Sequence, residues 1–145
     1  MSLFSVLSVS ASGMAAQRTR AELVVENLAN SETTRTPEGG PYRRKDAIFT
    51  SARQSSAFGA VFQTEMGAGG NGVEVSEVIE DTGEPDKRYL PGHPDADKDG
   101  YVSFPRINPA EEVVDLQSAH RGYEGNIAAM TAIKDMIMRS IDLLK

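Results

Sequence analysis

Apolar residues recur at helical spacing near the beginning of the chain. Alternating steps of three and four residues from Phe4 to Leu28 reach eight positions, of which seven are apolar and one is Arg18. This spacing is typical of a coiled-coil seam, where apolar side chains pack against a partner helix. The pattern predicts a helical segment over residues 1–30. Its predicted packing residues are Leu7, Ala11, Met14, Ala21, Val25 and Leu28.

A second apolar stripe follows a helix start signal at Asn108. Asn108 is a good N-cap, Pro109 suits the first helical position, and Glu111 can reach back to the cap. The same stepping from Val113 to the chain end gives ten positions, of which eight are apolar. The pattern predicts a helical segment over residues 108–145. Its predicted packing residues are Val113, Leu116, Tyr123, Ile127, Met130, Ile137, Ile141 and Leu144.

The two stripes hold more apolar surface than one helix pair can bury. A helix over residues 109–144 would be about 54 Å long, and apolar residues off the stripe, such as Met136, widen its apolar face. His120 and Lys134 interrupt the stripe, so we expect them at contacts with other subunits or with solvent. A helical hairpin with a large insertion is the simpler interpretation. The surplus apolar surface favours further helical partners, which makes the chain the subunit of a homo-oligomeric polymer.

The middle of the chain, residues 31–107, has no sustained helical period and holds most of the Gly and Pro residues. Residues 42–49 and the near-alternating residues 73–79 indicate short strands, separated by a flexible Gly-rich break at 67–72. The sequence therefore predicts a mainly α fold. Long N- and C-terminal helices pack as a coiled coil, and a small irregular middle region contributes short β-strands or hairpins between them.

Composition narrows the classes of partner and chemistry. The net charge is −6 without a Lys/Arg-rich block, so no nucleic-acid interface is expected. No apolar stretch approaches the ~20 residues of a membrane span. Residues 1–16 lack the positive start of a secretory signal peptide, so we expect them to belong to the mature helix. The absence of Cys excludes disulfides, thiolate metal sites and Cys nucleophiles.

An Asp-rich loop partly matches the calcium loop of an EF-hand. Asp95, Asp97 and Asp99 stand at loop positions 1, 3 and 5, and Gly100 stands at position 6. Position 12, which needs a bidentate Glu, is Arg106, and a cation there opposes calcium binding. We expect an Asp/Gly turn that joins the loop to a strand and no metal ligands. A calcium-responsive binding module remains the first alternative.

Catalytic motifs are absent from the sequence. There is no HExxH, GxSxG, GxGxxG or P-loop pattern, and the adjacent carboxylates Glu111 and Glu112 are typical of charge at a helix N-terminus. A hydrolase that uses His93 with Asp95 or Asp97 is the second alternative, but it lacks a nucleophile or a full ligand set. We expect no catalytic residue, no cofactor and no enzymatic activity.

Several stretches resemble the axial proteins of the bacterial flagellum. The run Asn27-Leu28-Ala29-Asn30, followed by residues 32–36, is similar to the signature that these proteins share. Residues 40–45, 92–102 and 111–126 further resemble the proximal rod proteins within that family. The resemblance covers nearly the whole chain and its motifs are specific.

The resemblance implies a structural role in the periplasm-spanning rod of the flagellar basal body. Family members pack their terminal helices into a helical tube that transmits torque, with the small middle domain outside. The implied partners are further copies of the chain, other rod proteins, the rod-base adaptor FliE and the flagellar type III export machinery, which exports subunits without cleaving a signal peptide. Asn27 and Asn30 are expected to cap the turn and to form inter-subunit hydrogen bonds. Alternatively, Asn30 only terminates the helix.

Overall fold

Two long helices and two short hairpins make up the computed structural model, which describes residues 3–52 and 71–143. Helix α1 (Leu3–Ala29) and helix α3 (Pro109–Asp142) are the terminal helices. Between them lie strands β1 (Lys45–Ser51), β2 (Val73–Glu80), β3 (Asp86–Tyr89) and β4 (Tyr101–Phe104). The predicted mainly α class with short strand pairs is confirmed. Most of the predicted Gly-rich break and Leu144 lie outside the described residues.

Helix α3 begins at the predicted start signal. The side chain of Asn108 accepts a hydrogen bond from the backbone N–H of Ala110 at 3.1 Å, and Pro109 is the first helical residue. Glu111 accepts a bond from the Asn108 side-chain amide at 3.1 Å, so its contact with the cap runs through the side chain and not the backbone. These contacts satisfy donors that the first helical turn leaves unpaired.

Helix α1 ends at the Asn motif. The backbone N–H and the side-chain amide of Asn30 both donate to the carbonyl of Glu26, at 3.1 and 2.9 Å. The carbonyl of Asn30 then accepts from the N–H of Thr33 at 3.0 Å, which turns the chain away from the helix. Within this chain Asn30 therefore terminates α1. None of the described helices is long and apolar enough to cross a membrane.

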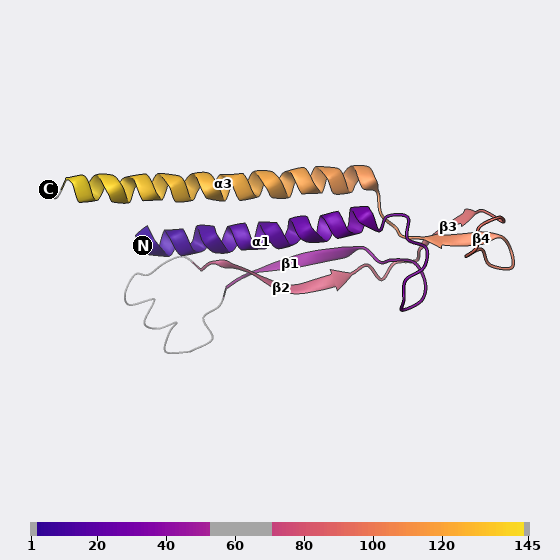
Figure 1. Cartoon of the computed structure of the whole chain (residues 1–145). Coiled ribbons are helices and arrows are strands. Elements are labelled where there is room, and N and C mark those ends of the chain that lie inside the picture. Colours follow the sequence, from indigo (N-terminus) through magenta and orange to yellow (C-terminus); the bar gives the residue numbers. More distant parts are fainter. Residues whose placement is uncertain (1–2, 53–70, 144–145) are drawn as a thin grey trace, which may run out of the picture.

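Helix α1 lies between α3 and the β1–β2 hairpin, and the two helices run in opposite directions (Figure 1). Their contact is built on small residues. Ala16 of α1 and Ala119 of α3 are buried. A Cβ atom added at Gly122 would lie 3.1 Å from Cδ of Gln17, and one added at Gly13 would lie 2.9 Å from Oδ1 of Asn126. A larger side chain at either glycine would therefore displace the side chain that it faces on the other helix.

The line of α3 that faces α1 differs from the predicted stripe. Its buried residues are Glu112, Ala119 and Ile133. Ala119 and Ile133 each stand one residue before the interruptions of the predicted stripe, His120 and Lys134, which are both exposed. The physical reason is the width of the apolar face of α3. Several adjacent rows of residues along α3 are apolar enough to face α1. The row that does so is determined by polar and small side chains of α3 that have partners on α1.

The middle region forms short antiparallel strand pairs, as predicted, and among the described residues there are two of them. Strand β1 pairs with β2 from Lys45 opposite Glu80 to Ser51 opposite Val73, with an irregularity after Ile48. The strand starts at Lys45, later than the predicted residue 42. The hairpin is attached to α1 at the end of the pair where Ser51 lies opposite Val73, because the N–H of Val73 donates to Oγ of Ser12 at 2.9 Å.

The second strand pair projects beyond the helix ends (Figure 1). Strand β3 pairs with β4 from Asp86 opposite Phe104 to Tyr89 opposite Tyr101. Val102 and Phe104 of β4 are buried, and the guanidinium of Arg88 lies 4.6 Å from the centre of the Phe104 ring. The sequence did not predict β3, because its four residues are all exposed and show no apolar alternation.

Candidate assembly surface

An apolar groove runs between α1 and α3, and no residue of the β1–β2 hairpin lines it. We call it the α1–α3 groove; it encloses about 850 Å³. It is lined by Gln17, Arg18, Ala21, Val113, Leu116, Gln117, Ala119, His120 and Tyr123. Oε1 of Gln17 is buried and has no hydrogen-bond donor among the described residues. Apolar atoms make up most of the groove surface.

The two predicted stripes form the walls of this groove. Arg18 and Ala21 belong to the stripe of α1, and Val113, Leu116 and Tyr123 belong to the stripe of α3. Because residues three and four apart share one helix face, the rest of each stripe continues along the same wall. The most regular apolar periodicity in the sequence thus lies beside the contact between α1 and α3.

The predicted packing residues fall into three groups. Half-buried ones are Leu7, Met14, Ala21, Leu28, Asn30, Leu116, Met130 and Ile137. Exposed ones are Ala11, Val25, Val113, Tyr123, Ile127 and Ile141. Asn27 is fully buried, and Leu144 lies outside the described residues. Val25 and Val113 keep 50% and 53% of their surface exposed, so this chain alone does not cover them.

Asn27 joins α1 to the start of β1. Its side-chain amide donates to the carbonyl of Lys45 at 2.8 Å, and its side-chain oxygen accepts from the N–H of Lys45 at 2.9 Å. The same oxygen accepts from the Tyr42 hydroxyl at 3.1 Å, and the amide also donates to Oε2 of Glu112 at 3.3 Å. All of these contacts lie within one chain, so the hydrogen bonds of Asn27 join three elements of its own subunit.

Glu112 is the second buried centre of this polar junction, with a side chain only 2% exposed. Nε of Arg44 donates to Oε1 of Glu112 at 2.5 Å. Arg44 also lies 3.5 Å from Asp115, which pairs with Arg20 of α1 at 3.1 Å. A buried carboxylate is tolerated only with such partners. The start of α3, the end of α1 and the start of β1 are therefore fixed to one another.

The polar junction raises the pKa of three side chains around it. Burial, followed by the charge and hydrogen bonding of Glu26, raises the pKa of the Tyr42 hydroxyl. The hydrogen bond to Glu26 raises the pKa of Lys45. Burial acts to lower the pKa of Arg44, but the hydrogen bond and charge of Glu112 outweigh it and the pKa is raised. These cations therefore keep their charge well above neutral pH.

Sequence reasoning missed the roles of Glu112 and Arg44. Glu112 was assigned to charge at the helix N-terminus, which fits its position, but its partners come from α1 and from the segment before β1. Arg44 lies inside residues 40–45, a stretch singled out only for its resemblance to rod proteins. No local pattern could link two residues separated by 68 positions.

The Asp-rich loop forms the predicted turn into a strand. Oδ1 of Asp97 accepts from the N–H groups of Asp99 and Tyr101, both at 2.9 Å, and Tyr101 begins β4. Gly100 adopts a positive φ of 82°, which favours glycine. Asp95 accepts from the Thr34 hydroxyl at 2.8 Å and so attaches the loop to the segment after α1. Across residues 3–52 and 71–143, no three His, Asp or Glu side chains are grouped to hold a metal ion.

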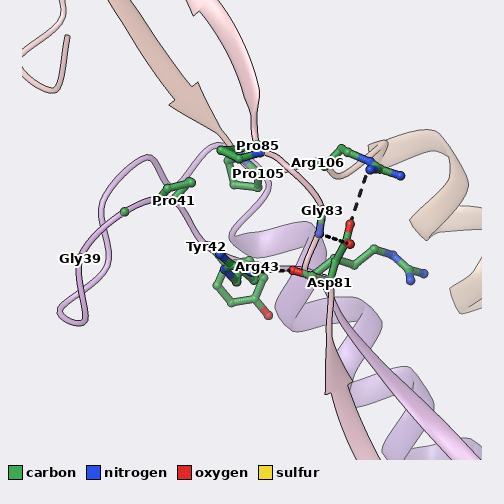
Figure 2. A pocket seen from close by; sticks show the side chains of 11 residues that line it. Gly39, Pro41, Tyr42, Arg43, Asp81, Gly83, Pro85, Pro105 and Arg106 are labelled. Carbon is green, nitrogen blue, oxygen red and sulfur yellow. Dashed lines mark hydrogen bonds and ion pairs between the residues drawn. The ribbon is translucent and has the colours of Figure 1, made fainter. Parts of the chain in front are cut away.

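A small pocket of about 110 Å³ lies beside the junction, where β2 ends (Figure 2). Arg43 donates to the backbone carbonyl of Asp81 at 3.2 Å, and the Asp81 carboxylate accepts from the N–H of Gly83 at 2.8 Å. Arg106 approaches the same carboxylate at 3.9 Å. The charged groups that line the pocket therefore contact one another. These contacts connect the end of β2 to the segment that leads into α3.

Comparison with known proteins finds relatives over the full chain. A family model described as the flagellar basal body rod FlgEFG protein C-terminal matches residues 98–143. The flagellar basal-body rod protein FlgC of Bacillus subtilis is 42% identical, and the alignment covers 100% of both chains. The protein of the same name from Borreliella burgdorferi is 37% identical, over 100% of this chain and 99% of its own. The Escherichia coli O6:H1 relative is 33% identical, over 99% and 98%.

Proposed function

The chain belongs to the family of flagellar basal-body rod proteins FlgC, and from this premise we propose that it polymerises through α1 and α3 into the helical tube of the proximal rod, which transmits torque. Membership makes it a structural component of the rod that assembles with other rod components. The observation that carries the finer proposal is the α1–α3 groove, whose walls are the two apolar stripes of the terminal helices.

Exposed residues of the two apolar stripes supply the energy for assembly. Val25, Val113, Tyr123 and Ile127 are exposed by 50%, 53%, 37% and 44%. Fully burying a large apolar side chain contributes about 1.5–3 kcal/mol, and a helix laid in the groove would cover several of them at once. An apolar surface of this kind on a small chain is typical of an interface.

This surface divides the chain into a core domain and an outer region. Residues 1–30 and 108–145 form a core domain whose helices pack as a coiled coil with those of neighbouring subunits. Residues 31–107 form an outer region, which includes the projecting β3–β4 pair. The exposed stripe residues, together with the half-buried Leu7, Met14 and Leu28, are the proposed packing residues. Asn27 and Asn30 hold the turn in the shape that neighbouring subunits meet.

The remaining partners and the location follow from the family premise. The subunit acts in the periplasm, is exported by the flagellar type III machinery without cleavage of a signal peptide, and meets FliE at the base of the rod. Small side chains at the contact between α1 and α3 bury little area, so the terminal helices of the free subunit are frayed and become fully ordered on assembly.

A paired substitution tests this function. Val113→Asp combined with Tyr123→Asp places two carboxylates on the α3 wall of the groove, and we expect loss of the rod in isolated basal bodies and loss of motility. Leu90→Asp is the matched control, because Leu90 is 42% exposed and lies outside both helices. Motile cells with intact rods carrying the groove variant would refute assembly through this surface.

A further inference from the structure

Gly72 stands where α1, β1 and β2 meet. A Cβ atom added at this residue would lie 2.6 Å from Oγ of Ser12, so a larger residue would displace the Ser12 side chain. The carbonyl of Gly72 accepts a hydrogen bond from the N–H of Ala52 at 2.7 Å, one pair beyond the end of the β1–β2 ladder. The following N–H, that of Val73, donates to Oγ of Ser12 at 2.9 Å. Contacts with α1 and β1 therefore favour glycine at this position and hold its carbonyl in place.

The N–H of Gly72 has no hydrogen-bond acceptor among residues 3–52 and 71–143. In an antiparallel ladder the two residues of a hydrogen-bonded pair exchange two bonds. Ala52 and Gly72 make only one of them, the bond to the Gly72 carbonyl. The residue before Gly72 is Asn71, which is exposed. An exposed Asn side chain thus precedes a backbone nitrogen that no described residue engages.

This combination favours a reaction of the Asn71 side chain with the main chain. The nitrogen of Gly72, after losing its proton to water, attacks Cγ of Asn71 and closes a succinimide ring. The bond from Cγ to the side-chain nitrogen breaks, and that nitrogen takes a proton from water and leaves as ammonia. Glycine has no Cβ to obstruct the attacking nitrogen, and an N–H without an acceptor has no hydrogen bond to break first. Ring closure at this pair therefore meets little resistance.

We propose that Asn71 is a site of spontaneous deamidation in the folded chain, and that the reaction releases one end of the β1–β2 hairpin from α1. Water is the only other reactant, and it opens the succinimide at either carbonyl to give aspartate or isoaspartate. Each product carries a carboxylate where Asn71 had a neutral amide. The net charge of −6 therefore becomes one unit more negative.

The other Asn residues precede nitrogens that are not free to attack. The residues after Asn27 and Asn126 lie inside α1 and α3, where backbone N–H groups bond along the helix. A proline follows Asn108 and has no N–H. The N–H after Asn30 donates to a carbonyl of α1 at 3.3 Å. The fold therefore restricts the reaction at these positions and leaves it open at Asn71.

The pair Asp99–Gly100 shows that the dipeptide alone does not decide the outcome. An aspartate before a glycine closes the same ring, although more slowly. The N–H of Gly100 donates to the carbonyl of Asp97 at 3.0 Å, so its nitrogen is engaged in the turn that leads into β4. The hydrogen bonding of the backbone thus distinguishes Gly72 from Gly100.

Isoaspartate at position 71 would change the attachment of the hairpin. In isoaspartate the main chain runs through the former side-chain carbon, so it becomes one carbon atom longer directly before Gly72. The added length displaces the Gly72 carbonyl and the N–H of Val73, which bond Ala52 and Ser12. Both bonds cannot be kept, whereas the second attachment of the hairpin, at Asn27, is unaffected.

Ageing the purified full-length chain at mildly alkaline pH tests the site. Mass spectrometry of its peptides should show the change from amide to acid at Asn71 at least about fivefold faster than at Asn30, because only the latter reaction must first break a hydrogen bond. The rate at Asn71 should also agree, to within about that same factor, between buffer and concentrated urea. A greater slowing in buffer, or a rate no higher than that at Asn30, would overturn the inference.

Asn71→Gln is the matched control, because glutamine keeps the amide but needs a larger ring and should remain unmodified over the same period. Amide hydrogen exchange then compares the aged chain with the aged variant. The N–H of Val73 should exchange faster in the isoaspartate fraction of the aged chain, because its bond to Ser12 is lost. Equal exchange at Val73 in the two samples would overturn the release of the hairpin.

Discussion

The side-chain amide of Asn27 bonds both the N–H and the carbonyl of Lys45, at 2.9 and 2.8 Å. A helix side chain thus satisfies the backbone of the first residue of β1, much as a neighbouring strand would. The contact places the hairpin against α1 at the point where the helix also meets α3.

Replacing Asn27 by Ala should lower the free energy of unfolding by about 2–4 kcal/mol. The substitution leaves the N–H and carbonyl of Lys45 and the hydroxyl of Tyr42 without their buried partner. Urea unfolding followed by circular dichroism measures the loss. Asn30→Ala is the matched control and should cost about 1 kcal/mol, because the Asn30 side chain only ends the helix. Equal losses for the two variants would contradict the special role of Asn27.

Glu112 and Arg44 should be energetically coupled. Glu112→Gln and Arg44→Met each leave a buried or half-buried charge without its partner, so each should destabilise the chain. The double variant should lose less than the sum, with a coupling free energy of about 1–3 kcal/mol. A double-mutant cycle on urea unfolding measures it. Additive losses would show that the two side chains act independently.

Stability should fall as the pH rises beyond about 10. The folded chain raises the pKa of Tyr42 above its unfolded value of ~10, so the protonated hydroxyl stabilises the fold below that pH. This stabilisation is lost as the pH rises through the folded pKa, and the raised pKa of Lys45 acts in the same direction. Tyr42→Phe should flatten the alkaline loss in urea midpoints measured across pH. An unchanged pH profile in that variant would refute this origin.

Two glycines of α3 should respond differently to alanine. Gly125→Ala adds a Cβ that meets nothing within 4 Å, so it should stabilise the isolated chain by about 1 kcal/mol through helix propensity. Gly122→Ala brings the Cβ within 3.1 Å of Gln17, and the required displacement should cancel that gain. Thermal unfolding of the two variants compares them directly, and equal gains would contradict the close approach at Gly122.

The parts of the fold that local patterns control were predictable. The start of α3 followed from Asn108 and Pro109, and β2 from the alternation of its Val residues. The face of α3 that packs against α1 was not predictable, because the apolar face of α3 is wide. Contacts of Asn126, Gly122 and Glu112 with α1 determine which face is buried. Their partners on α1 stand at least 85 positions away in the sequence. The periodicity of the sequence shows which helix faces are apolar. Polar pairs between residues far apart in the sequence determine which apolar face is turned inward.

The β1–β2 hairpin is attached to one side of α1 at two points, Ser12 and Asn27. The two attachments are fifteen residues apart, so the hairpin screens about 22 Å of that side of the helix at ~1.5 Å per residue. Each subunit therefore has a closed back and an open front. In the assembly that we propose, a neighbouring copy can approach α1 only from the sides that the hairpin leaves free, so the hairpin restricts how successive copies can be oriented.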